Sequence, residues 1–361
     1  MAGPGDIVGV IGAGTMGAGI AQLALEAGHP VLLHDVDEAA IARGRAHIRT
    51  GLERRAARLD LDAESADGWV DGRLAGLHDA PTLADVAAAG PTIVIEAAVE
   101  DLGAKRTIFH ALDAATPADA ILATNTSALS VAAIAAAAAT HPERVIGLHF
   151  FNPAPVMALV EVVSPPLADP AVVARAVAIV TAWGKTAVVC ADRPGFIVNR
   201  VNRPFTIEAL RILESGAATV SEIDDAVRAG GFPMGPFELM DLTGIDVTFA
   251  AATGIWEGLG RPDRLRPSPI QAAMVEAGTL GRKTGLGFYR YADAKRIGEG
   301  DTSGPPHPAR HLDPIEIRDR ILAAVAREAG IAVEEGVAPP DVIDRALRLG
   351  AGHPRGPFAS E

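Results

Sequence analysis

Short apolar runs alternate with helical patterns along the first half of the chain. The runs that predict strands are Ile7–Ile11, Val31–His34, Thr92–Ile95, Ala120–Thr124 and Val145–His149. Patterns with the helical period cover Ala18–Glu26, Leu102–Ala114 and Ser130–Ala139. Continuous β-branched and apolar runs are typical of strands that are buried on both faces of a parallel sheet. The alternation therefore predicts a Rossmann-type, doubly wound α/β domain.

Helical patterning dominates the second half of the chain, from Pro194 onward. The predicted helices are Phe196–Glu214, Val220–Ala229 and a stretch around Leu239–Thr253. The segment that follows is rich in glycine, proline and charge, which is typical of a linker. We therefore divide the chain into a Rossmann domain (1–190), a helical domain (191–290), a linker (291–312) and a C-terminal segment (313–361).

The C-terminal segment is a partial repeat of the helical domain. Its sequence HPRGPF at 353–358 echoes FPMGPF at 232–237, and Asp344 stands upstream where Asp224 does in the first copy. The copy stops after its Gly-Pro-Phe, and charged residues occupy the neighbourhood where Asn199 would fall. We expect this half-repeat (313–361) to be structural rather than a second active site.

Composition narrows the class of protein. The 361 residues are enough for two domains with sizeable cores, and the formal charge of -13 argues against a nucleic-acid or anionic-membrane surface. A single cysteine, Cys190, excludes an internal disulfide and fits a reducing cytoplasm. The alanine-rich run 131–139 is much shorter than the roughly 20 apolar residues that span a bilayer. We expect a cytoplasmic protein without nucleic-acid or membrane partners.

A glycine-rich loop follows the first predicted strand. Gly12, Gly14 and Gly17 have the spacing GxGxxG, with Thr15 and Met16 between the second and third glycine. The first glycine permits a tight turn, the second lets the backbone approach a pyrophosphate, and the third lets helix pack on strand. The helix N-terminus then offers N–H groups and a positive dipole end to the phosphates. This context predicts a dinucleotide site.

Asp35 stands at the end of the second predicted strand. A carboxylate there accepts both hydroxyls of the adenosine ribose and repels a 2′-phosphate. The next residue, Val36, provides no arginine for that phosphate, so we predict NAD rather than NADP. Asp35 also fits as the N-cap of the following helix, and the two roles are compatible.

Four polar residues form a candidate catalytic set. Ser127 follows one strand and His149 closes the next, so both lie at the carboxyl edge of the sheet, where such folds bind ligands. Glu161 and Asn199 follow later in the chain. Oxidation of an alcohol by a nicotinamide requires a base, a carboxylate to orient it and neutral hydrogen-bonding groups. Each residue taken alone also fits a structural role, such as a helix cap, a satisfied strand-end histidine or a solvated polar group.

Several motifs together resemble those of the L-3-hydroxyacyl-CoA dehydrogenases, from Ile7 to about Tyr289. They are GAGTMG (12–17), NTS (125–127), HFFNP (149–153), GFIVNR (195–200), PMGPFEL (233–239) and KTGLGFY (283–289). The resemblance implies that His149 takes the proton from the substrate 3-hydroxyl and that Glu161 orients and stabilises its imidazole. It also implies that Ser127 and Asn199 hydrogen-bond the substrate oxygens.

The resemblance extends to cofactor and substrate contacts. We assign Glu100, Lys105 and Asn125 to the NAD site, alongside the glycine loop and Asp35. Coenzyme A carries several phosphates, and we assign their contacts to Arg54 and Arg58, in the arginine-rich stretch after Asp35. Family members tend to carry lysines in the next loop, whereas this chain reads RLDLD at 58–62. No metal is expected.

The helical domain bears on the oligomeric state. Stand-alone relatives dimerise through it, and longer relatives carry tandem copies. We therefore expect a homodimer, or a monomer if the half-repeat covers the dimer surface. A rival interpretation is a dehydrogenase of a hydroxy acid or sugar acid without coenzyme A, as in gulonate-type relatives, but the motif after His149 favours the acyl-CoA branch. A non-catalytic dinucleotide-binding protein is the third alternative. Acyl-chain length, and whether the tail ends in a carboxylate, stay open.

Overall fold

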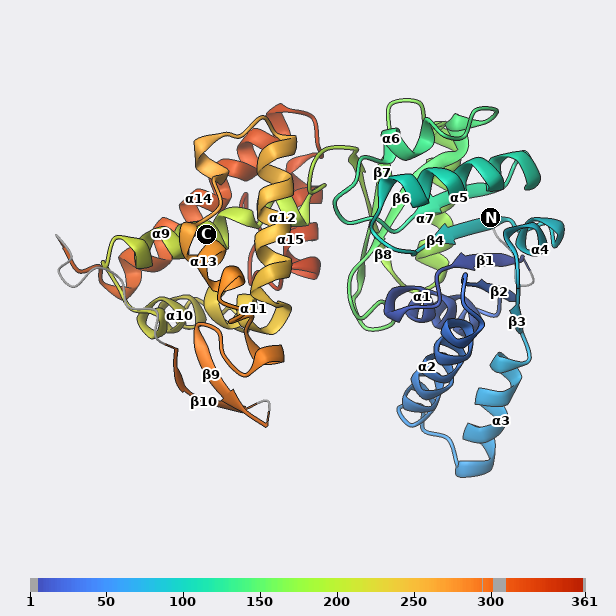
Figure 1. Ribbon diagram of the computed structural model, residues 1–361, viewed down its shortest axis with the longest axis horizontal. Helices are drawn as coiled ribbons and strands as arrows, with labels where there is room; N and C mark the ends of the chain where they lie inside the picture. Colours follow the sequence, from blue (N-terminus) through green and yellow to red (C-terminus); the bar gives the residue numbers. More distant parts are fainter. Residues whose placement is uncertain (1–5, 294, 301–309, 360–361) are drawn as a thin grey trace. The chain divides into compact units, whose positions relative to one another are not determined.

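A computed structural model describes residues 6–293, 295–300 and 310–359 of the chain. The chain divides into two compact units, Met1–Arg193 and Pro194–Glu361 (Figure 1). Within the described ranges, no helix is both long and apolar enough to cross a membrane.

In the described part of the first unit, eight strands form one sheet in the order β3-β2-β1-β4-β5-β6-β7-β8. The strands are β1 (Val8–Ile11), β2 (Val31–His34), β3 (Leu77–Asp79), β4 (Ile93–Glu96), β5 (Ile121–Thr124), β6 (Val145–Phe150), β7 (Leu159–Ser164) and β8 (Thr186–Ala191). Neighbouring strands are parallel except β6 and β7, which run antiparallel. The doubly wound Rossmann-type fold is confirmed.

The helices of this unit cover both faces of the sheet. They are α1 (Thr15–Glu26), α2 (Glu38–Ala56), α3 (Ala63–Leu74), α4 (Leu83–Ala88), α5 (Leu102–Ala115), α6 (Val131–Ala135) and α7 (Pro170–Ala182). Helix α6 is shorter than the predicted 130–139. Its last turn tightens, because the backbone N–H of Ala137 bonds to Ile134 O, three residues back, instead of continuing the α-helical pattern.

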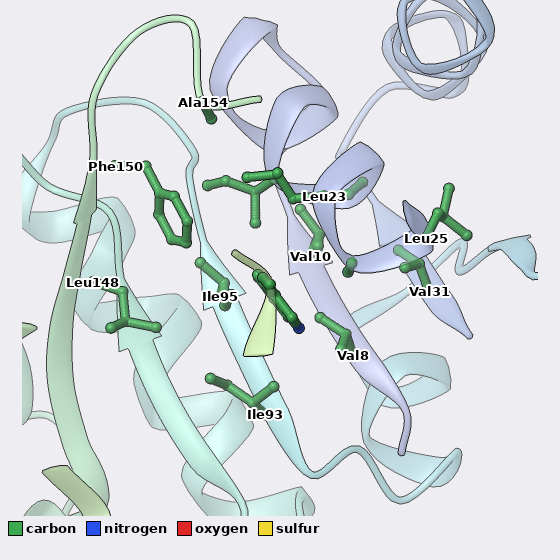
Figure 2. Packing of buried hydrophobic residues seen from close by; sticks show 14 of the residues in the cluster. Val8, Val10, Leu23, Leu25, Val31, Ile93, Ile95, Leu148, Phe150 and Ala154 are labelled. Atoms are coloured by element: carbon green, nitrogen blue, oxygen red, sulfur yellow. The ribbon is translucent and has the colours of Figure 1, made fainter. Parts of the chain in front are cut away.

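Alternate strand residues build two cores, one on each face. Val8 and Val10 of β1 pack with the side chains of α1 and α7 in one cluster, part of which Figure 2 shows. Val94 of β4 points the other way and packs with side chains from α4, α5 and α6. Burial on both faces explains why the strands read as unbroken apolar runs.

The second unit is mostly helical. Its elements are α8 (Val198–Val201), α9 (Arg203–Glu214), α10 (Val220–Ala229), α11 (Pro236–Thr243), α12 (Ile245–Gly258), α13 (Pro269–Glu276), α14 (Pro314–Glu334), α15 (Pro340–Gly350) and the strands β9 (Tyr289–Ala292) and β10 (Lys295–Glu299). Two predicted helices are each divided in two. The first is interrupted at Asn202, ahead of Pro204, whose ring carries no N–H to donate. The second breaks at Gly244, which has a φ of 102°.

Part of the segment 291–312, expected to be a linker, is a hairpin. Strand β10 pairs antiparallel with β9, with a register irregularity between Arg296 and Gly298. Residues 301–309 of that segment lie outside the described residues. The glycine and charge that suggested a linker thus belong, in part, to an exposed two-stranded ribbon.

The half-repeat copies the local structure of the first helical domain. Asp224, on α10, accepts a hydrogen bond from Phe237 N at 2.9 Å, and Asp344, on α15, accepts one from Phe358 N at 2.9 Å. In each copy the glycine of Gly-Pro-Phe lies directly against the aspartate, since a Cβ on Gly235 or Gly356 would fall within 2.2 Å of an aspartate side-chain atom. The two turns are therefore built by the same sequence rule.

The two copies also contact each other reciprocally. Arg200 of α8 bonds to Glu328 of α14 at 2.9 Å, and Arg320 of α14 bonds to Glu208 of α9 at 2.6 Å. Arg320 follows Arg200 by as many residues as Glu328 follows Glu208. The two arginines are therefore equivalent positions of the two copies, and so are the two glutamates. Reciprocal pairing, in which the arginine of each copy binds the glutamate of the other, is typical of an isologous interface with two-fold symmetry. The half-repeat thus packs on the first copy as one member of a symmetric pair would pack on the other.

Candidate active site

The glycine loop between β1 and α1 has the shape that a dinucleotide phosphate needs. Gly12 has a φ of 99°, and a Cβ there would lie 2.5 Å from Ala97 O. A Cβ at Gly17 would lie 1.7 Å from Gly12 O, whereas one at Gly14 would meet no atom within 4 Å. The first and third glycines are therefore required by packing. The second faces open space, and no side chain caps the N-terminus of α1 there. Thr15 and Met16 continue into the first turn.

Asp35, directly after β2, is tied to the same loop. Its Oδ2 accepts a hydrogen bond from Ala13 N at 2.8 Å, which holds the carboxylate beside the glycine turn. The N-cap role belongs to Asp37, whose side chain accepts from Ala39 N. Asp35 is half-buried, so one oxygen fixes the loop and the other is available for a ribose hydroxyl.

His149 and Glu161 face each other across the antiparallel pair β6 and β7, where they are direct register partners. The His149 Nδ1 lies 2.6 Å from Glu161 Oε2, and Glu161 is fully buried. The Phe151 ring lies 4.6 Å from the imidazole, centroid to centroid. A short bond to a buried carboxylate fixes the ring orientation and places the proton on Nδ1, so Nε2 is the unprotonated ring nitrogen.

Cys190, on β8, belongs to the apolar surroundings of this pair. It is 2% exposed, as expected for a small core residue. Burial raises the pKa of its thiol, and the charges of Glu161 and Asp192 raise it further. The sulfur is therefore a neutral thiol at physiological pH and provides no nucleophile.

Ser127 lies on an exposed loop that Glu100 organises. One oxygen of Glu100, Oε1, accepts from Thr126 Oγ1 at 2.5 Å, from Ser127 N at 3.0 Å and from Ala128 N at 3.2 Å. Glu100 therefore fixes the backbone that presents the Ser127 hydroxyl. Its assignment as a cofactor contact stays a prediction.

Lys105, also expected near the cofactor, is 1% exposed. Its Nζ lies 2.6 Å from Glu96 Oε1 and 3.3 Å from Glu100 Oε2. Glu96 in turn accepts from Thr124 Oγ1 at 2.7 Å. The lysine charge thus neutralises two carboxylates beneath the loop instead of adding to a surface basic patch. Sequence reasoning did not identify this ion pair, for which a lysine nine residues after a strand-end glutamate is a weak signal.

Asn125 connects the two strand ends that carry the site. Its Oδ1 accepts a hydrogen bond from Phe150 N at 2.9 Å, which joins the end of β5 to the residue after His149. The structure therefore brings together His149, Glu161, Asn125 and the Ser127 loop at the carboxyl edge of the sheet, as predicted. Whether Asn125 also contacts the cofactor stays a prediction.

Comparisons with known proteins identify this arrangement. The model of the family described as "3-hydroxyacyl-CoA dehydrogenase, NAD binding domain" matches residues 7–193, and that of the C-terminal domain matches 195–291 and 317–360. The chain belongs to the 3-hydroxyacyl-CoA dehydrogenase family. It is therefore an NAD-dependent oxidoreductase of 3-hydroxyacyl-CoA thioesters. The second matched segment of the C-terminal domain, 317–360, falls within the half-repeat.

Relatives of this dehydrogenase cover most of its length. A 3-hydroxyadipyl-CoA dehydrogenase of Escherichia coli strain K12 is 42% identical over 93% of this chain and 71% of that protein. A 3-hydroxybutyryl-CoA dehydrogenase of Mycobacterium tuberculosis is 43% identical over 79% of this chain and 98% of that protein. The crystal structure of an Escherichia coli K12 3-hydroxybutyryl-CoA dehydrogenase has a TM-score of 0.87 at 35% identity, and covers 98% of this chain and 90% of that one.

The arginines assigned to coenzyme A in this dehydrogenase lie at the end of α2. Four other arginines of the stretch form ion pairs with carboxylates: Arg43, Arg45, Arg49 and Arg55. Arg54 and Arg58 are exposed, and neither forms an ion pair with any residue in the described ranges. Their charges are thus available to an anionic ligand, and their contacts with coenzyme A stay a prediction.

Asn199 lies in the second unit, on α8, and is half-buried. The half-repeat binds two residues that follow it in the chain. Arg200 bonds to Glu328 and to Glu335, the latter at 2.8 Å, and Asn202 Oδ1 lies 2.7 Å from His353 Nε2. Sequence reasoning found Asn199 but did not find this support. The short helix that carries Asn199 is therefore held by a segment more than a hundred residues away.

Proposed function

We propose that His149 is the general base that removes the proton from the substrate 3-hydroxyl, and the general acid in the reverse direction. The observation that carries this proposal is the 2.6 Å contact between His149 Nδ1 and Glu161 Oε2. The Nδ1–H group donates a hydrogen bond to Glu161. The Nε2 atom then accepts the substrate proton, and the carboxylate stabilises the imidazolium that forms.

The other polar groups hold the substrate oxygen in place. Bound NAD supplies the acceptor for the hydride that leaves C3. The Ser127 hydroxyl and the Asn199 carboxamide donate hydrogen bonds to the reacting oxygen, which fixes its position and stabilises its negative charge. Ser127 is supported by the Glu100 network, and Asn199 by the half-repeat. Glu100, Lys105 and Asn125 then shape the nicotinamide side of the site.

The substrate is an acyl-CoA thioester whose phosphates bind Arg54 and Arg58. The relatives' names offer two kinds of acyl tail. One is the short apolar chain of a 3-hydroxybutyryl thioester, and the other is the carboxylate-terminated chain of a 3-hydroxyadipyl thioester.

We also propose that the half-repeat occupies the surface by which stand-alone relatives dimerise, so that this chain is a monomer. The reciprocal pairs Arg200–Glu328 and Arg320–Glu208 support this, because they reproduce within one chain the pairing rule of a two-fold interface.

A direct test is NADH consumption by the purified protein with acetoacetyl-CoA, with free acetoacetate as the comparison. Consumption with the thioester alone is expected, since the CoA portion supplies binding energy that acetoacetate lacks. Equal rates with both compounds would contradict an acyl-CoA substrate.

The base is tested by replacing His149 with alanine. We expect turnover to fall about 10²–10⁴-fold, the usual loss when a general base is removed, while NADH binding stays largely intact. His78→Ala, at an exposed position of the edge strand β3, is the matched control and should keep full activity. A loss below about tenfold in folded His149→Ala would refute the assignment.

A further inference from the structure

Arg203, the first residue of α9, has no acidic partner within the described ranges. Its Nε is buried and has no hydrogen-bond partner among the described residues. The other two arginines of α8 and α9, Arg200 and Arg211, both pair with carboxylates. No ion pair within the described ranges includes Arg203. Burial lowers the pKa of Arg203 to about 10, so the group still carries its charge at neutral pH.

Buried charges in proteins are paired or bind ligands, because a desolvated charge without a counter-ion destabilises the fold. A guanidinium with a buried, unbonded Nε therefore indicates an anion that the chain itself does not provide. The planar fork of Nε and a terminal nitrogen matches the two oxygens of a carboxylate, so the expected ligand is a carboxylate bound by two parallel hydrogen bonds.

The place of Arg203 along the helix indicates which carboxylate. Arg203 follows Asn199 by four residues, and Asn202 between them keeps helical dihedrals, with φ -82° and ψ -6°. Side chains four apart lie on one helix face, about 5–6 Å from Cβ to Cβ. Burial agrees with this, because Asn199, Asn202 and Arg203 are half-buried, while Val198, Arg200 and Val201 are buried.

A substrate whose C3 oxygen lies at Asn199 would extend its acyl tail along this face. In a six-carbon chain the terminal carboxylate stands three bonds beyond C3, comparable with the rise of one helical turn, about 5.4 Å. An apolar four-carbon tail would end before Arg203 and leave the guanidinium unpaired.

We propose that Arg203 binds the distal carboxylate of the acyl chain, so that this dehydrogenase prefers six-carbon 3-hydroxyacyl thioesters that end in a carboxylate. The inference rests on the proposed function, since it takes Asn199 to contact the reacting oxygen. It decides between the two kinds of tail left open above.

The test compares two thioesters of equal chain length, 3-oxoadipyl-CoA and 3-oxohexanoyl-CoA, by NADH consumption with the full-length protein. The wild type should prefer the dicarboxylic substrate in kcat/KM by about 10²-fold, the range for a buried, hydrogen-bonded charge pair. Arg203→Met should remove about that factor from the ratio, chiefly through KM for 3-oxoadipyl-CoA. Arg203→Lys should restore part of the preference, because its ammonium keeps the charge but lacks the two parallel N–H donors of a guanidinium.

The matched control is Arg261→Met, at a position after the end of α12 where the side chain is 65% exposed and pairs with Glu257. It should leave the ratio unchanged. A purely structural role for Arg203 would lower both kcat/KM values alike and lower the melting temperature of Arg203→Met, whereas removal of a half-buried charge without an acidic partner should keep or raise that temperature. Equal losses on both substrates, or no wild-type preference, would overturn the proposal while the dehydrogenase assignment stands. Failure to reduce either thioester would refute the proposed function itself.

Discussion

The two copies of the helical motif share a frame but differ in how tightly their equivalent arginines are held. Arg200 of the first copy is fully buried between Glu328 and Glu335, and Arg264 binds the other oxygen of Glu328 at 2.6 Å. In the half-repeat, the side chain of Arg320 is 44% exposed, and Glu208 is its only ion-pair partner among the described residues. The buried ion pair lies beside Asn199. The half-exposed pair lies at the equivalent place of the half-repeat, where no catalytic residue is expected. An approximate symmetry has therefore been broken in favour of the copy that carries Asn199, the proposed substrate contact.

Of the changes that test the difference between the two copies, truncation before α14 should have the largest effect on the protein. Deletion of residues 313–361 removes both carboxylate partners of Arg200 and exposes the faces of α9 and α10 that α14 covers. We expect the truncated protein to associate or aggregate, because an exposed apolar face with an unpaired buried charge is unstable in water. Light scattering after size exclusion reports the mass. A soluble truncated protein with the mass of one chain would show that the half-repeat covers no association surface.

Neutralising each acidic partner separately sharpens the comparison. Glu328→Gln removes the buried one of the two counter-charges of Arg200, and breaking a buried pair costs about 3–5 kcal/mol of the free energy of unfolding. Glu208→Gln breaks the half-exposed pair, for which solvent screening limits the cost to about 1 kcal/mol or less. Urea unfolding of the two variants measures both values. Similar losses would mean that the two pairs are energetically equivalent despite their different exposure.

A smaller, pH-dependent difference should come from the turn of the half-repeat. His353 stands where the first copy has Phe232, and the two rings meet with centroids 4.9 Å apart. Burial lowers the pKa of His353 to about 4. Because the folded pKa lies below the unfolded value, near 6.5, the neutral histidine stabilises the fold above pH 6.5, and this contribution is lost as pH falls toward 4.

Between pH 6.5 and pH 5 the protonation of His353 should lower the free energy of unfolding of the wild type by about 1.5 kcal/mol. His353→Gln keeps a donor for Asn202 but cannot titrate, so its stability should fall less over the same interval. Thermal unfolding at each pH checks the difference, with the exposed His78→Gln as the control. Parallel pH profiles for wild type and His353→Gln would exclude His353 as the titrating group.

Local sequence patterns were sufficient to predict the fold class and several of its elements. The predicted boundaries of β2 and α10 match the observed ones, because an apolar run bounded by turn residues and a capping box on Thr219 act over a few residues. The interruptions at Asn202 and Gly244 were missed, since amphipathic periodicity continues across a short break in the helix.

The candidate site was predictable to the extent that it follows strand ends. His149 and Glu161 meet because antiparallel register brings them together, and each was visible as a polar residue in an apolar run. The ion pairs Glu96–Lys105 and Glu328–Arg200 were not predictable, because each depends on the packing of elements that no local pattern connects. Contacts at long sequence separation require the tertiary structure.

The antiparallel register of β6 and β7 has a consequence for how this dehydrogenase can vary. The histidine and its carboxylate are positioned by the main-chain ladder of two adjacent strands, and the loop between them, 151–158, takes no part in that pairing. Insertions or exchanges in the loop can therefore reshape what surrounds the imidazole without moving it. A shift of one residue within either strand would turn one member of the pair to the opposite face of the sheet. Directed evolution of new substrate preferences should thus accept changes of loop length more readily than changes of strand length.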